Sequence, residues 1–498
     1  MLHEFQKLLK MTQPTPSLHP HLPADDPGLL DAVVAGAARL SPEQGLALLE
    51  SMPTAELGAW ADRRACAIHG DRIRTYVIDR NINYTNVCTA RCTFCAFRRD
   101  GDEADAYTLD TETLLRKVDE LVGIGGTQIL MQGGMNPELP LSWYLDLLHA
   151  IKARHPQVHV HAFSPPEFIE FVNFFDPPGT TLRGKILHVM EQLRAAGLDS
   201  VPGGGGEIFA PAVRRKIGLG KCDAEAWLTT MHVAHELGMN TSATMMFGHI
   251  EGLADRVHHM ELVRRWQDRA IRDFADGAAA DAPRDGDGRE RRGGGRYKAF
   301  ISWPFQRENT PLGRAKEWDP DARPIPGGHG GSPEDFPAEF PGDVVARLDG
   351  SGTKDLHPEF GRVVRMAGAT SYLRTQALSR LYLDNVYSIG ASWVTMGPHI
   401  GQVGLRFGAT DMGSVMMEEN VVSAAGTTYC LNEAMICRLI RDAGFLPAQR
   451  DNEYNLLRVH RTPDAPDLRV RDWSSLRAQR LHVERTAESD VELTIART

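Results

Sequence analysis

Three cysteines lie close together in the stretch NVCTARCTFCAF and are the clearest chemical signature of the sequence. Cys88, Cys92 and Cys95 have the spacing C-x3-C-x2-C, whereas the rest of the seven cysteines stand apart. A structural zinc site usually needs four ligands from two cysteine pairs, and the sequence has no second pair. Thiolates also select iron–sulfur clusters. A cubane cluster on three thiolates keeps one iron open for chemistry. We predict such a cluster, with a zinc loop or a surface-exposed group of thiols as the alternatives.

The composition restricts the class of protein. The chain has 498 residues, 42% hydrophobic content and a net charge of −10. A chain of this size buries a large core, and an acidic balance without basic blocks argues against nucleic acid as a partner. We find no secretory signal pattern and no apolar run long enough for a membrane span. Scattered cysteines without a disulfide pattern fit a reducing compartment. We therefore expect a cytoplasmic protein.

The order of the predicted elements indicates a barrel. Residues 1–27 are rich in Pro and His and are expected to be disordered, and residues 28–72 are predicted as an N-terminal helical extension. Over residues 73–460, β-rich runs alternate with amphipathic helices, which predicts a parallel sheet. The predicted strands are RTYVIDRNINYT, TQILMQGG, VHVHAFSP, LDSVPGGGG, TSATMMFGH, KAFISWPF, NVYSIGASWV and GQVGLRFGA. About eight strand–helix units fit a (β/α)8 barrel. Residues 461–498 are then a C-terminal tail.

Three stretches interrupt the alternation and are predicted to be insertions. They lie near residues 174–188, 276–296 and 312–360. The first resembles a loop before a helix, the second is charged and Gly-rich, and the third has little periodicity. Stretches of this length are usually functional lids or flexible loops. We expect all three to lie outside the barrel core.

Polar and glycine-rich motifs follow the predicted strands. The cysteine loop follows the first strand, QGG the second, HAFSPPE the third, GGGGE the fourth and GHIE the fifth. A parallel barrel carries its active site at these strand ends. A doubly wound sheet is the alternative, but no G-x-G-x-x-G loop follows the first strand. The agreement between motifs and strand ends favours the barrel.

The cysteine spacing, with Phe94 before the third cysteine, resembles the radical S-adenosylmethionine superfamily. This resemblance implies a [4Fe–4S] cluster whose open iron binds S-adenosylmethionine and whose electron releases a 5′-deoxyadenosyl radical. The QGG turn would then approach the methionyl amino group, since glycine permits close backbone approach. An ordinary strand-ending turn is the alternative for QGG. The residues predicted to bind the cofactor are Phe97, Gln132, Gly133, Gly134, Glu207, Arg214 and Glu251.

Longer stretches resemble the cyclic dehypoxanthinyl futalosine synthase family of menaquinone biosynthesis. They include HAFSPPE, GLDSVPGGGGEI, SATMMFGHIE, FISWPFQRENTPL and SRLYLDNVYSIGASWVTMGPHIGQVGLRFGATDMGS. The resemblance runs over residues 28–460 apart from the insertions. It implies hydrogen abstraction from C4′ of the substrate ribose and attack of the carbon radical on the attached benzoate ring. It also implies a nucleoside-like substrate and a flavodoxin- or ferredoxin-type electron donor.

The substrate contacts are predicted from the strand ends. Glu167 and Asp411 are the predicted catalytic residues. The predicted substrate-binding residues are His161, Ser164, Gln402, Ser414 and Glu419. His161 is equally well interpreted as a core histidine, and Glu419 as part of a charged first helical turn.

The benzoate carboxylate also needs either a cation, for which Arg374 and Arg380 are the candidates, or a cradle of backbone N–H groups. Two related enzymes, aminofutalosine synthase and the radical S-adenosylmethionine half of FO synthase, share most of these features. The QGG, HAFSPPE and SWPFQ stretches favour the cyclase. An alternative of another class is a non-catalytic iron–sulfur electron carrier, which normally has four cysteine ligands.

Overall fold

The computed structural model describes six ranges of the chain, which are residues 28–70, 72–218, 220–274, 294–314, 367–427 and 429–461. The predicted disordered N-terminus and nearly all of the predicted C-terminal tail lie outside these ranges. So do most of the insertions predicted near 276–296 and 312–360.

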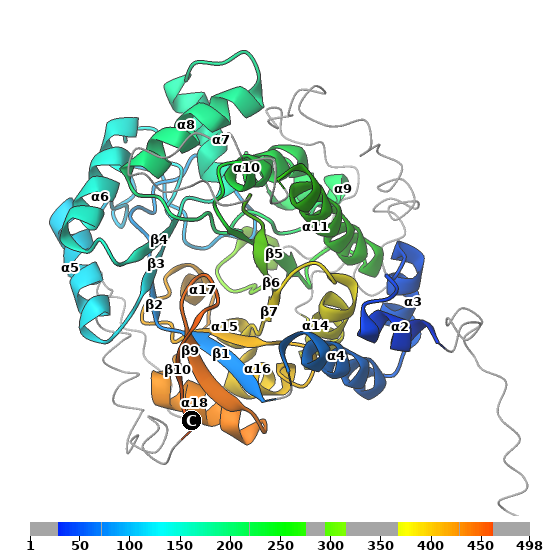
Figure 1. Cartoon of the computed structure of the whole chain (residues 1–498). Coiled ribbons are helices and arrows are strands. Elements are labelled where there is room, and N and C mark those ends of the chain that lie inside the picture. The colour runs from blue at the N-terminus through cyan, green and yellow to red at the C-terminus, as the bar shows by residue number, and fades with distance from the viewer. Residues whose placement is uncertain are drawn as a thin grey trace, which may run out of the picture.

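Parallel strand segments close around one interior and form a (β/α)8-type barrel, as predicted (Figure 1). The first predicted strand bends at Ile78 into two parts, β1 (Ile73–Val77) and β2 (Asp79–Ile82). β1 pairs with β8, and β2 pairs with β3, so the bend joins the two sheets. The other barrel strands are β3 (Gln128–Met131), β4 (His159–Ala162), β5 (Thr241–Phe247), β6 (Tyr297–Pro304), β7 (Ser388–Gly390) and β8 (Asp411–Ser414).

The fourth barrel segment is irregular. Its residues Ser200 and Val201 form only isolated bridges, to His161 of β4 and to Thr241 of β5. These bridges still connect the two sheets and close the barrel. The glycine run that follows explains why regular pairing stops, because glycine weakens a strand interior.

Two sequence predictions about elements need correction. The predicted eighth strand, GQVGLRFGA, instead forms the end of helix α16 (Pro398–Gly404) and the turn that follows it, and the eighth strand is β8. Pro398 occupies the first helical turn, where its fixed φ favours a helix start. The insertion near 174–188 is shorter than predicted, because Thr181 caps helix α8 (Leu182–Ala196) by accepting a hydrogen bond from the Gly184 N–H. Only residues 176–181 separate it from α7 (Pro165–Phe175).

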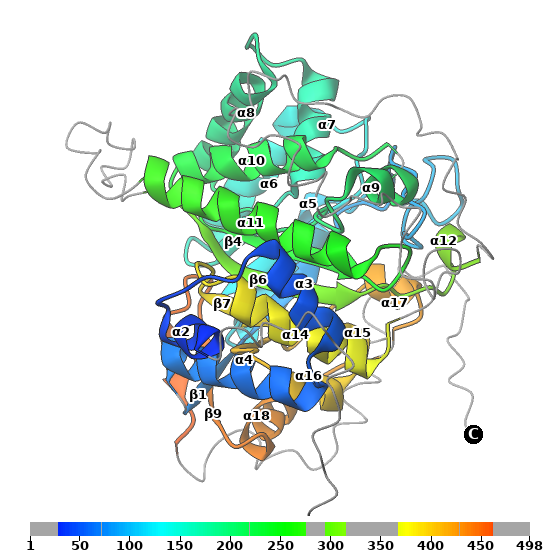
Figure 2. The same ribbon diagram turned by 90° about the vertical axis from the view of Figure 1, so that its right-hand side faces the viewer.

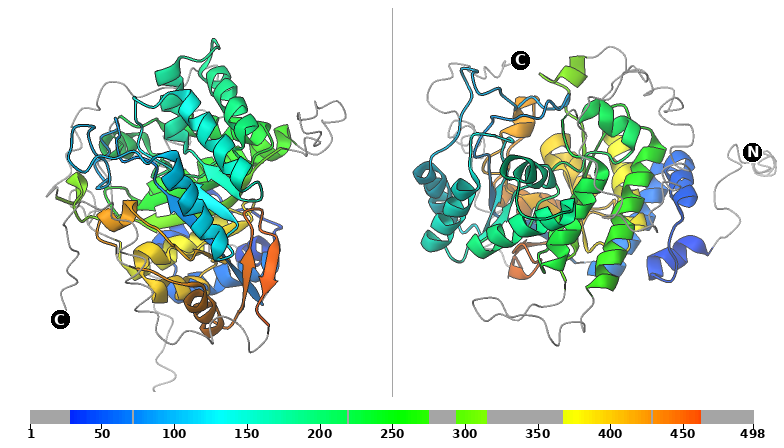
Figure 3. Two further views of the ribbon diagram at one scale, coloured as in Figure 1. Left: turned by 90° about the vertical axis from the view of Figure 1, so that its left-hand side faces the viewer. Right: turned by 90° about the horizontal axis from the view of Figure 1, so that it is seen from above.

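Helices surround the strands on the outside (Figure 3). Asp110 and Asp223 cap two of them, each by accepting a hydrogen bond from the backbone N–H three residues ahead. The larger outer helices are α5 (Thr111–Gly123), α6 (Leu141–Arg154), α10 (Ala224–Glu236), α11 (Leu253–Asp273) and α14 (Ala369–Tyr382). Shorter ones are α9 (Pro211–Ile217), α12 (Pro311–Arg314), α15 (Trp393–Met396), α17 (Val421–Ala424) and α18 (Glu433–Asp442).

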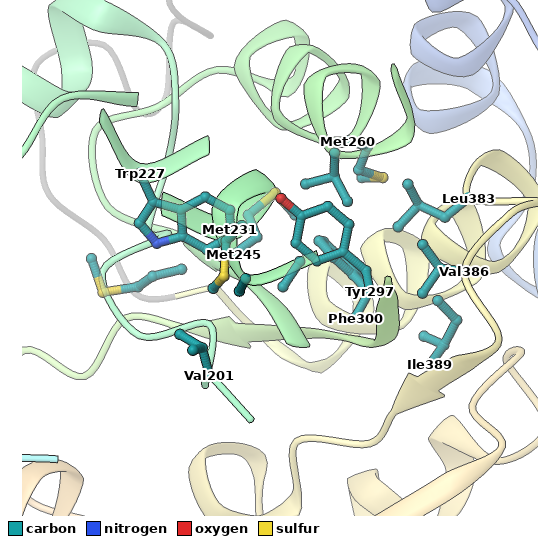
Figure 4. Packing of buried hydrophobic residues seen from close by; sticks show 14 of the residues in the cluster. Val201, Trp227, Met231, Met245, Met260, Tyr297, Phe300, Leu383, Val386 and Ile389 are labelled. Atoms are coloured by element: carbon teal, nitrogen blue, oxygen red, sulfur yellow. The ribbon is translucent and has the colours of Figure 1, made fainter. Parts of the chain in front are cut away.

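The main core lies between these helices and the barrel. Figure 4 shows Trp227 and Met231 of α10 and Met260 of α11 packed against Tyr297 and Phe300 of β6. All five side chains are fully or almost fully buried. Burial of each large apolar side chain contributes roughly 1.5–3 kcal/mol, so this layer holds the strands rigidly in place.

The N-terminal extension consists of α2 (Leu29–Ala35), α3 (Pro42–Ser51) and α4 (Thr54–His69) and lies against α14 and α11 (Figure 2). Arg374 of α14 donates to the carbonyls at the end of α3. Arg380, also on α14, donates to the carbonyls of Leu383 and Val386. Both arginines stabilise the packing of helix ends. The prediction that one of them binds a substrate carboxylate is therefore wrong.

Two further strands extend the sheet beside β1. β9 (Leu446–Arg450) pairs with β1 in parallel, and β10 (Leu456–Val459) pairs with β9 in antiparallel orientation (Figure 1). The turn between them contacts the amino-terminal end of the barrel, where Asn240 donates to Glu453. No helix within the described ranges is both long enough and apolar enough to cross a membrane.

Candidate active site

A cavity of about 510 Å³ runs through the barrel. The cysteine loop, the QGG turn and the glycine run line it at the carboxyl ends of the strands, and Asn240, Lys298 and Asn452 line it at the amino ends. Most of the predicted site residues meet on its wall. These are Cys88, Cys92, Cys95, Phe97, Gln132, Gly133, Gly134, His161, Ser164, Glu167, Glu207, Asp411, Ser414 and Glu419. Arg214, Glu251 and Gln402 do not line it.

The cysteine loop is held by backbone hydrogen bonds to other parts of the barrel. The Cys88 N–H donates to the Arg99 carbonyl at 3.1 Å, and the Thr93 N–H donates to the Ile217 carbonyl at 2.9 Å. Cys92 is buried, whereas Cys88 and Cys95 are partly exposed to the cavity. In the described ranges, no three His, Cys, Asp or Glu side chains are grouped as ligands of a single metal ion.

A lysine that sequence reasoning missed stands beside the thiols. Lys221 Nζ lies 2.8 Å from Glu207 Oε1 and 5.1 Å from the ring centroid of Phe94. Burial raises the pKa of the Cys92 thiol to about 12, while the positive charge of Lys221 acts in the opposite direction. Metal ligation requires the thiolate form, so Lys221 favours the form of Cys92 that binds iron. Lys221 lies in an irregular loop, and no motif identified it.

Glu207 has an acceptor that the protein does not use. Its Oε2 is buried without a hydrogen-bond partner among the described residues, although Arg214 Nη1 lies 3.9 Å away. The backbone of Glu207 also has a φ of 30°, a region that is unusual for a residue other than glycine. Strained residues with unmet polar atoms cluster at ligand sites. The Glu207 carboxylate therefore suits a ligand that carries hydroxyl donors, such as a ribose.

The glycines of the two loops are required by close packing. A Cβ at Gly134 would lie 2.1 Å from the Val87 carbonyl oxygen, in the segment that leads into the cysteine loop. A Cβ at Gly206, in the glycine run, would lie 2.3 Å from the Thr244 carbonyl oxygen. The glycine run thus lets the protein's own chain pack closely, in addition to any approach of a ligand. Substitution at either site would displace the neighbouring motif.

Three predicted site residues have structural roles instead. Arg214 is buried and donates to the carbonyls of Gly205, Gly206 and Cys222, so it fastens the glycine run. Glu251 accepts from the N–H groups of Gly248 and His249 and pairs with Arg256 at 2.7 Å, which fixes the turn after β5. Gln402 donates to the Leu439 carbonyl of α18. In each case the polar group is occupied by the protein away from the cavity.

The two predicted catalytic carboxylates lie on the cavity wall with their oxygens already occupied. Glu167 accepts from the Tyr84 hydroxyl at 2.6 Å, the Gly133 N–H at 3.2 Å, and the N–H and hydroxyl of Ser164 at 2.7 Å each. Asp411 accepts from the Arg450 guanidinium at 2.6 and 3.0 Å, and also from Thr75 and the Gly413 N–H. These contacts favour positioning roles for both residues.

A Glu167→Gln variant tests this positioning role. Burial raises the pKa of Glu167 above its ordinary value of 4.5, although hydrogen bonds from Tyr84 and Ser164 act in the opposite direction. A raised pKa in the folded state keeps the proton bound above pH 4.5, so the wild-type unfolding free energy falls as pH rises through that window. A glutamine side chain does not titrate, so the unfolding free energy of the variant does not decrease in this way. Its amide has one acceptor oxygen, so either the Gly133 N–H or the Ser164 N–H loses its acceptor, which costs about 1 kcal/mol.

The difference in unfolding free energy between wild type and Glu167→Gln should therefore decrease as pH rises. Thermal unfolding of both proteins from acidic to mildly basic pH measures it. If the difference instead grew with pH, the carboxyl would be ionised in the folded protein and its pKa would be lowered.

Polar side chains from alternate strand positions line the middle of the barrel. Asp79 accepts from Ser414 and, at 3.1 Å, from Gln128, and burial raises its pKa. Asn81 Oδ1 and Gln128 Oε1 are buried without a hydrogen-bond partner within the described ranges. Both residues line the cavity, so these two oxygens are available as hydrogen-bond acceptors there. The sequence offered a signal in the polar side chains of Asp79, Asn81 and Asn83 at every second position, because alternate positions of a strand share a face.

The remaining predicted substrate-binding residues differ in whether a hydrogen-bonding group is still available for a substrate. Glu419 accepts from the N–H groups of Val421 and Val422 at the start of α17, and burial raises its pKa. Burial lowers the pKa of His161 to about 3, so its imidazole is neutral. Ser164 donates to Glu167. His161 therefore keeps an available acceptor. Its Nδ1 is hydrogen-bonded to Ser200, whereas no partner of its Nε2 occurs in the described part of the chain.

The sequence is similar to known proteins of one enzyme family. Residues 82–263 match the Radical SAM superfamily, and residues 354–462 match the CofH/MqnC C-terminal region. A Halalkalibacterium halodurans protein named cyclic dehypoxanthine futalosine synthase is 36% identical over 440 residues, which are 88% of this chain and 97% of the relative. The Streptomyces coelicolor protein of the same name is 34% identical over 90% of this chain and 93% of the relative. The chain belongs to this family of radical S-adenosylmethionine enzymes.

Relatives with other names are also similar. The aminodeoxyfutalosine synthase of Thermus thermophilus is 32% identical and covers 87% of this chain and 97% of its own length. Among solved structures, methylornithine synthase (PylB) superposes with a TM-score of 0.53 at 15% identity, over 84% of this chain and 97% of that chain. At such low identity the likeness concerns the fold, and it confirms the predicted barrel.

The family confirms the predicted cofactors. Enzymes of the radical S-adenosylmethionine superfamily use a [4Fe–4S] cluster and S-adenosylmethionine, and so does this one. The arrangement of the site fits both groups, since three thiols and the unpartnered acceptor of Glu207 share one cavity. The alternatives of a zinc loop and a non-catalytic electron carrier are therefore excluded.

Proposed function

We propose that this enzyme converts dehypoxanthine futalosine to cyclic dehypoxanthinylfutalosine by hydrogen abstraction from C4′ and ring closure, within menaquinone biosynthesis. The observation that carries the proposal is the full-length similarity to two relatives of that name, together with a cavity whose wall combines the cysteine triple with unpartnered polar acceptors. We further propose a flavodoxin- or ferredoxin-type protein as electron donor.

The carboxyl end of the cavity is the proposed cofactor site. We assign Cys88, Cys92 and Cys95 as the cluster ligands and the Glu207–Lys221 pair as contacts of S-adenosylmethionine. When bound, the two cofactors supply a 5′-deoxyadenosyl radical that removes a hydrogen atom. Glu207 then orients the nucleoside part through its unpartnered Oε2, and Lys221 contributes a positive charge beside the thiolates. Charge-assisted contacts of this kind fix orientation strongly.

The middle of the barrel is the proposed substrate site. Asn81 Oδ1 and Gln128 Oε1 would accept from the hydroxyls of the substrate ribose. Apolar side chains complete the wall and exclude water, and they include Leu130, Met246, Ile301 and Trp303. A reactive carbon radical needs such a water-poor, rigid site so that only the aromatic ring is within reach.

The assay that tests the function is anaerobic. The reconstituted and reduced enzyme receives S-adenosylmethionine and dehypoxanthine futalosine, and the products are analysed by mass spectrometry. A product lighter by two hydrogen atoms, formed together with 5′-deoxyadenosine, supports the proposal. If 5′-deoxyadenosine forms without that product, the substrate is wrong, and the substrates of aminodeoxyfutalosine synthase and FO synthase are the next to test.

A Glu207→Gln variant tests the cofactor site. Hydrogen bonds to charged groups contribute about 1.5–3 kcal/mol, so the variant should bind S-adenosylmethionine roughly 10- to 100-fold more weakly. Equilibrium dialysis against labelled cofactor measures the dissociation constant. Glu225→Gln is the matched control, because Glu225 is exposed on α10 away from the cavity. An unchanged constant in Glu207→Gln would remove Glu207 from the cofactor site.

A further inference from the structure

Two histidines of β4 and one serine form a hydrogen-bonded chain. Ser200 Oγ lies 2.6 Å from His161 Nδ1 and 2.6 Å from His159 Nε2. Asn452 Nδ2 lies 2.8 Å from the same nitrogen of His159. The three side chains are therefore linked in the order His161, Ser200, His159, with Asn452 beside the last two.

This chain leads from the cavity to the amino end of the barrel. His161 lines the cavity, whereas Ser200 is completely buried and lines no part of it. His159 begins β4, is partly exposed and does not line the cavity. The cysteine loop follows β2 at the opposite end of the strands. A proton moving along this chain would thus travel away from the proposed cofactor site.

The three groups have the donors and acceptors that a proton relay needs. A serine hydroxyl both donates and accepts, and a neutral imidazole has one nitrogen of each kind. With both imidazoles protonated at Nδ1, His161 donates to Ser200 Oγ, and His159 Nε2 accepts from both the Ser200 hydroxyl and the Asn452 amide. This arrangement leaves His161 Nε2 as an acceptor, and the structure gives that atom no partner in the described ranges.

The surrounding charges favour movement toward His159. At His161, burial lowers the pKa to about 3 and the charges of His159 and Arg450 add to that effect, although a backbone hydrogen bond at Ser200 acts in the opposite direction. Burial also lowers the pKa of His159, and Lys152 acts in the same direction. Three carboxylates, Asp199, Asp451 and Glu453, act the other way at His159. A proton is therefore held better at His159 than at His161.

We propose that His161 accepts the proton released at ring closure and that Ser200 and His159 pass it to solvent. This inference rests on the proposed function. After C4′ bonds to the benzoate ring, the C–H bond at the attacked ring carbon breaks and its proton goes to His161 Nε2. Of the three electrons in that bond and the ring radical, two restore the aromatic ring. The third passes to a one-electron acceptor of the iron–sulfur class. General base catalysis by a placed imidazole suits this step.

The tautomers of the resting protein give a test that needs no turnover. In full-length protein labelled with ¹⁵N-histidine, long-range proton–nitrogen spectra should show His161 and His159 protonated at Nδ1. Loss of one signal in His161→Gln and of another in His159→Gln assigns the resonances. A proton on Nε2 of His161 would overturn the proposal, because that atom could then accept nothing.

Coupling of the two products gives the second test. His161→Gln, Ser200→Ala and His159→Gln should each lower the yield of cyclised product per 5′-deoxyadenosine, by ~100-fold for His161→Gln. Hydrogen abstraction itself should continue in all three variants. Ser200 and His159 do not line the cavity, so a loss of coupling there cannot come from a lost substrate contact.

Ile129→Val is the control for packing. Ile129 is buried, does not line the cavity and pairs in register with Val160, which lies between the two histidines, so this variant should keep the wild-type ratio of products. A wild-type ratio in Ser200→Ala and His159→Gln would overturn the relay and leave His161 as a substrate contact. Absence of cyclised product from the wild-type enzyme would instead overturn the function on which the relay rests.

Discussion

Replacement of Cys92 by alanine is expected to abolish loading of the iron–sulfur cluster and, with it, all cleavage of S-adenosylmethionine. The cluster needs three thiolates, and the cavity offers no other thiol within the described ranges, since Cys66, Cys222, Cys430 and Cys437 do not line it. Cys92 packs against Ala90 and Met135 in a small cluster of buried residues. Alanine removes one sulfur there, so the barrel should still fold.

Iron and sulfide content, the electron paramagnetic resonance signal of the reduced protein and 5′-deoxyadenosine formation measure this effect. Cys66→Ser is the matched control. Cys66 lies on α4 away from the cavity, and its Sγ makes only a long contact of 3.8 Å with Arg74, so its replacement leaves the cluster site unchanged. The control should load a full cluster and cleave S-adenosylmethionine at the wild-type rate. A fully loaded cluster in Cys92→Ala would mean that the ligand set is different.

The cysteine loop could be recognised from the sequence because its chemistry is local. Three thiols in one short loop must lie near each other whatever the fold. The barrel could be predicted for a related reason, since the carboxyl ends of parallel strands meet at one edge and the motifs follow those ends. This explains why Gln132, Ser164 and Glu207 line one cavity although they lie far apart in the chain.

The roles of single polar residues could not be predicted in the same way. Arg214 follows the glycine run, where the sequence suggests an anion site, but the fold brings four backbone carbonyls within reach of its guanidinium. Lys221 lies in a loop without periodicity, yet it is the cation beside the thiols. Which partner a side chain meets depends on packing between distant segments, and residue spacing does not encode that.

The prediction of the final strand was wrong for a local reason. Its apolar residues look like a strand, but Pro398 follows Gly397, whose φ is 86°, and this pair starts a helix. The eighth strand, β8, begins only at Asp411. The carboxylate of Asp411 pairs with Arg450, which lies on β9. No sequence pattern pointed to β9, and so the ion pair could not be foreseen. Asp411 therefore looked catalytic from its position at a strand end alone.

An Asp411→Asn variant should lose about 3 kcal/mol or more of unfolding free energy, the typical cost when one partner of a buried ion pair is removed. The side chains of Asp411 and Arg450 are 2% and 8% exposed. Burial opposes the charge on Arg450, but Asp411 outweighs it, so the pKa of Arg450 is raised and the guanidinium stays charged. An asparagine amide has only one acceptor oxygen, so its NH2 must face either the Arg450 Nε–H or the Gly413 N–H.

A second substitution separates stability from catalysis. Asp411→Asn combined with Arg450→Gln removes both charges, so thermal unfolding should show part of the lost stability restored. Below its unfolding temperature, the double variant should still form cyclised product in step with 5′-deoxyadenosine, because His161 and not Asp411 is the proposed proton acceptor. A stable double variant that makes 5′-deoxyadenosine without cyclised product would return Asp411 to the catalytic role that the sequence suggested.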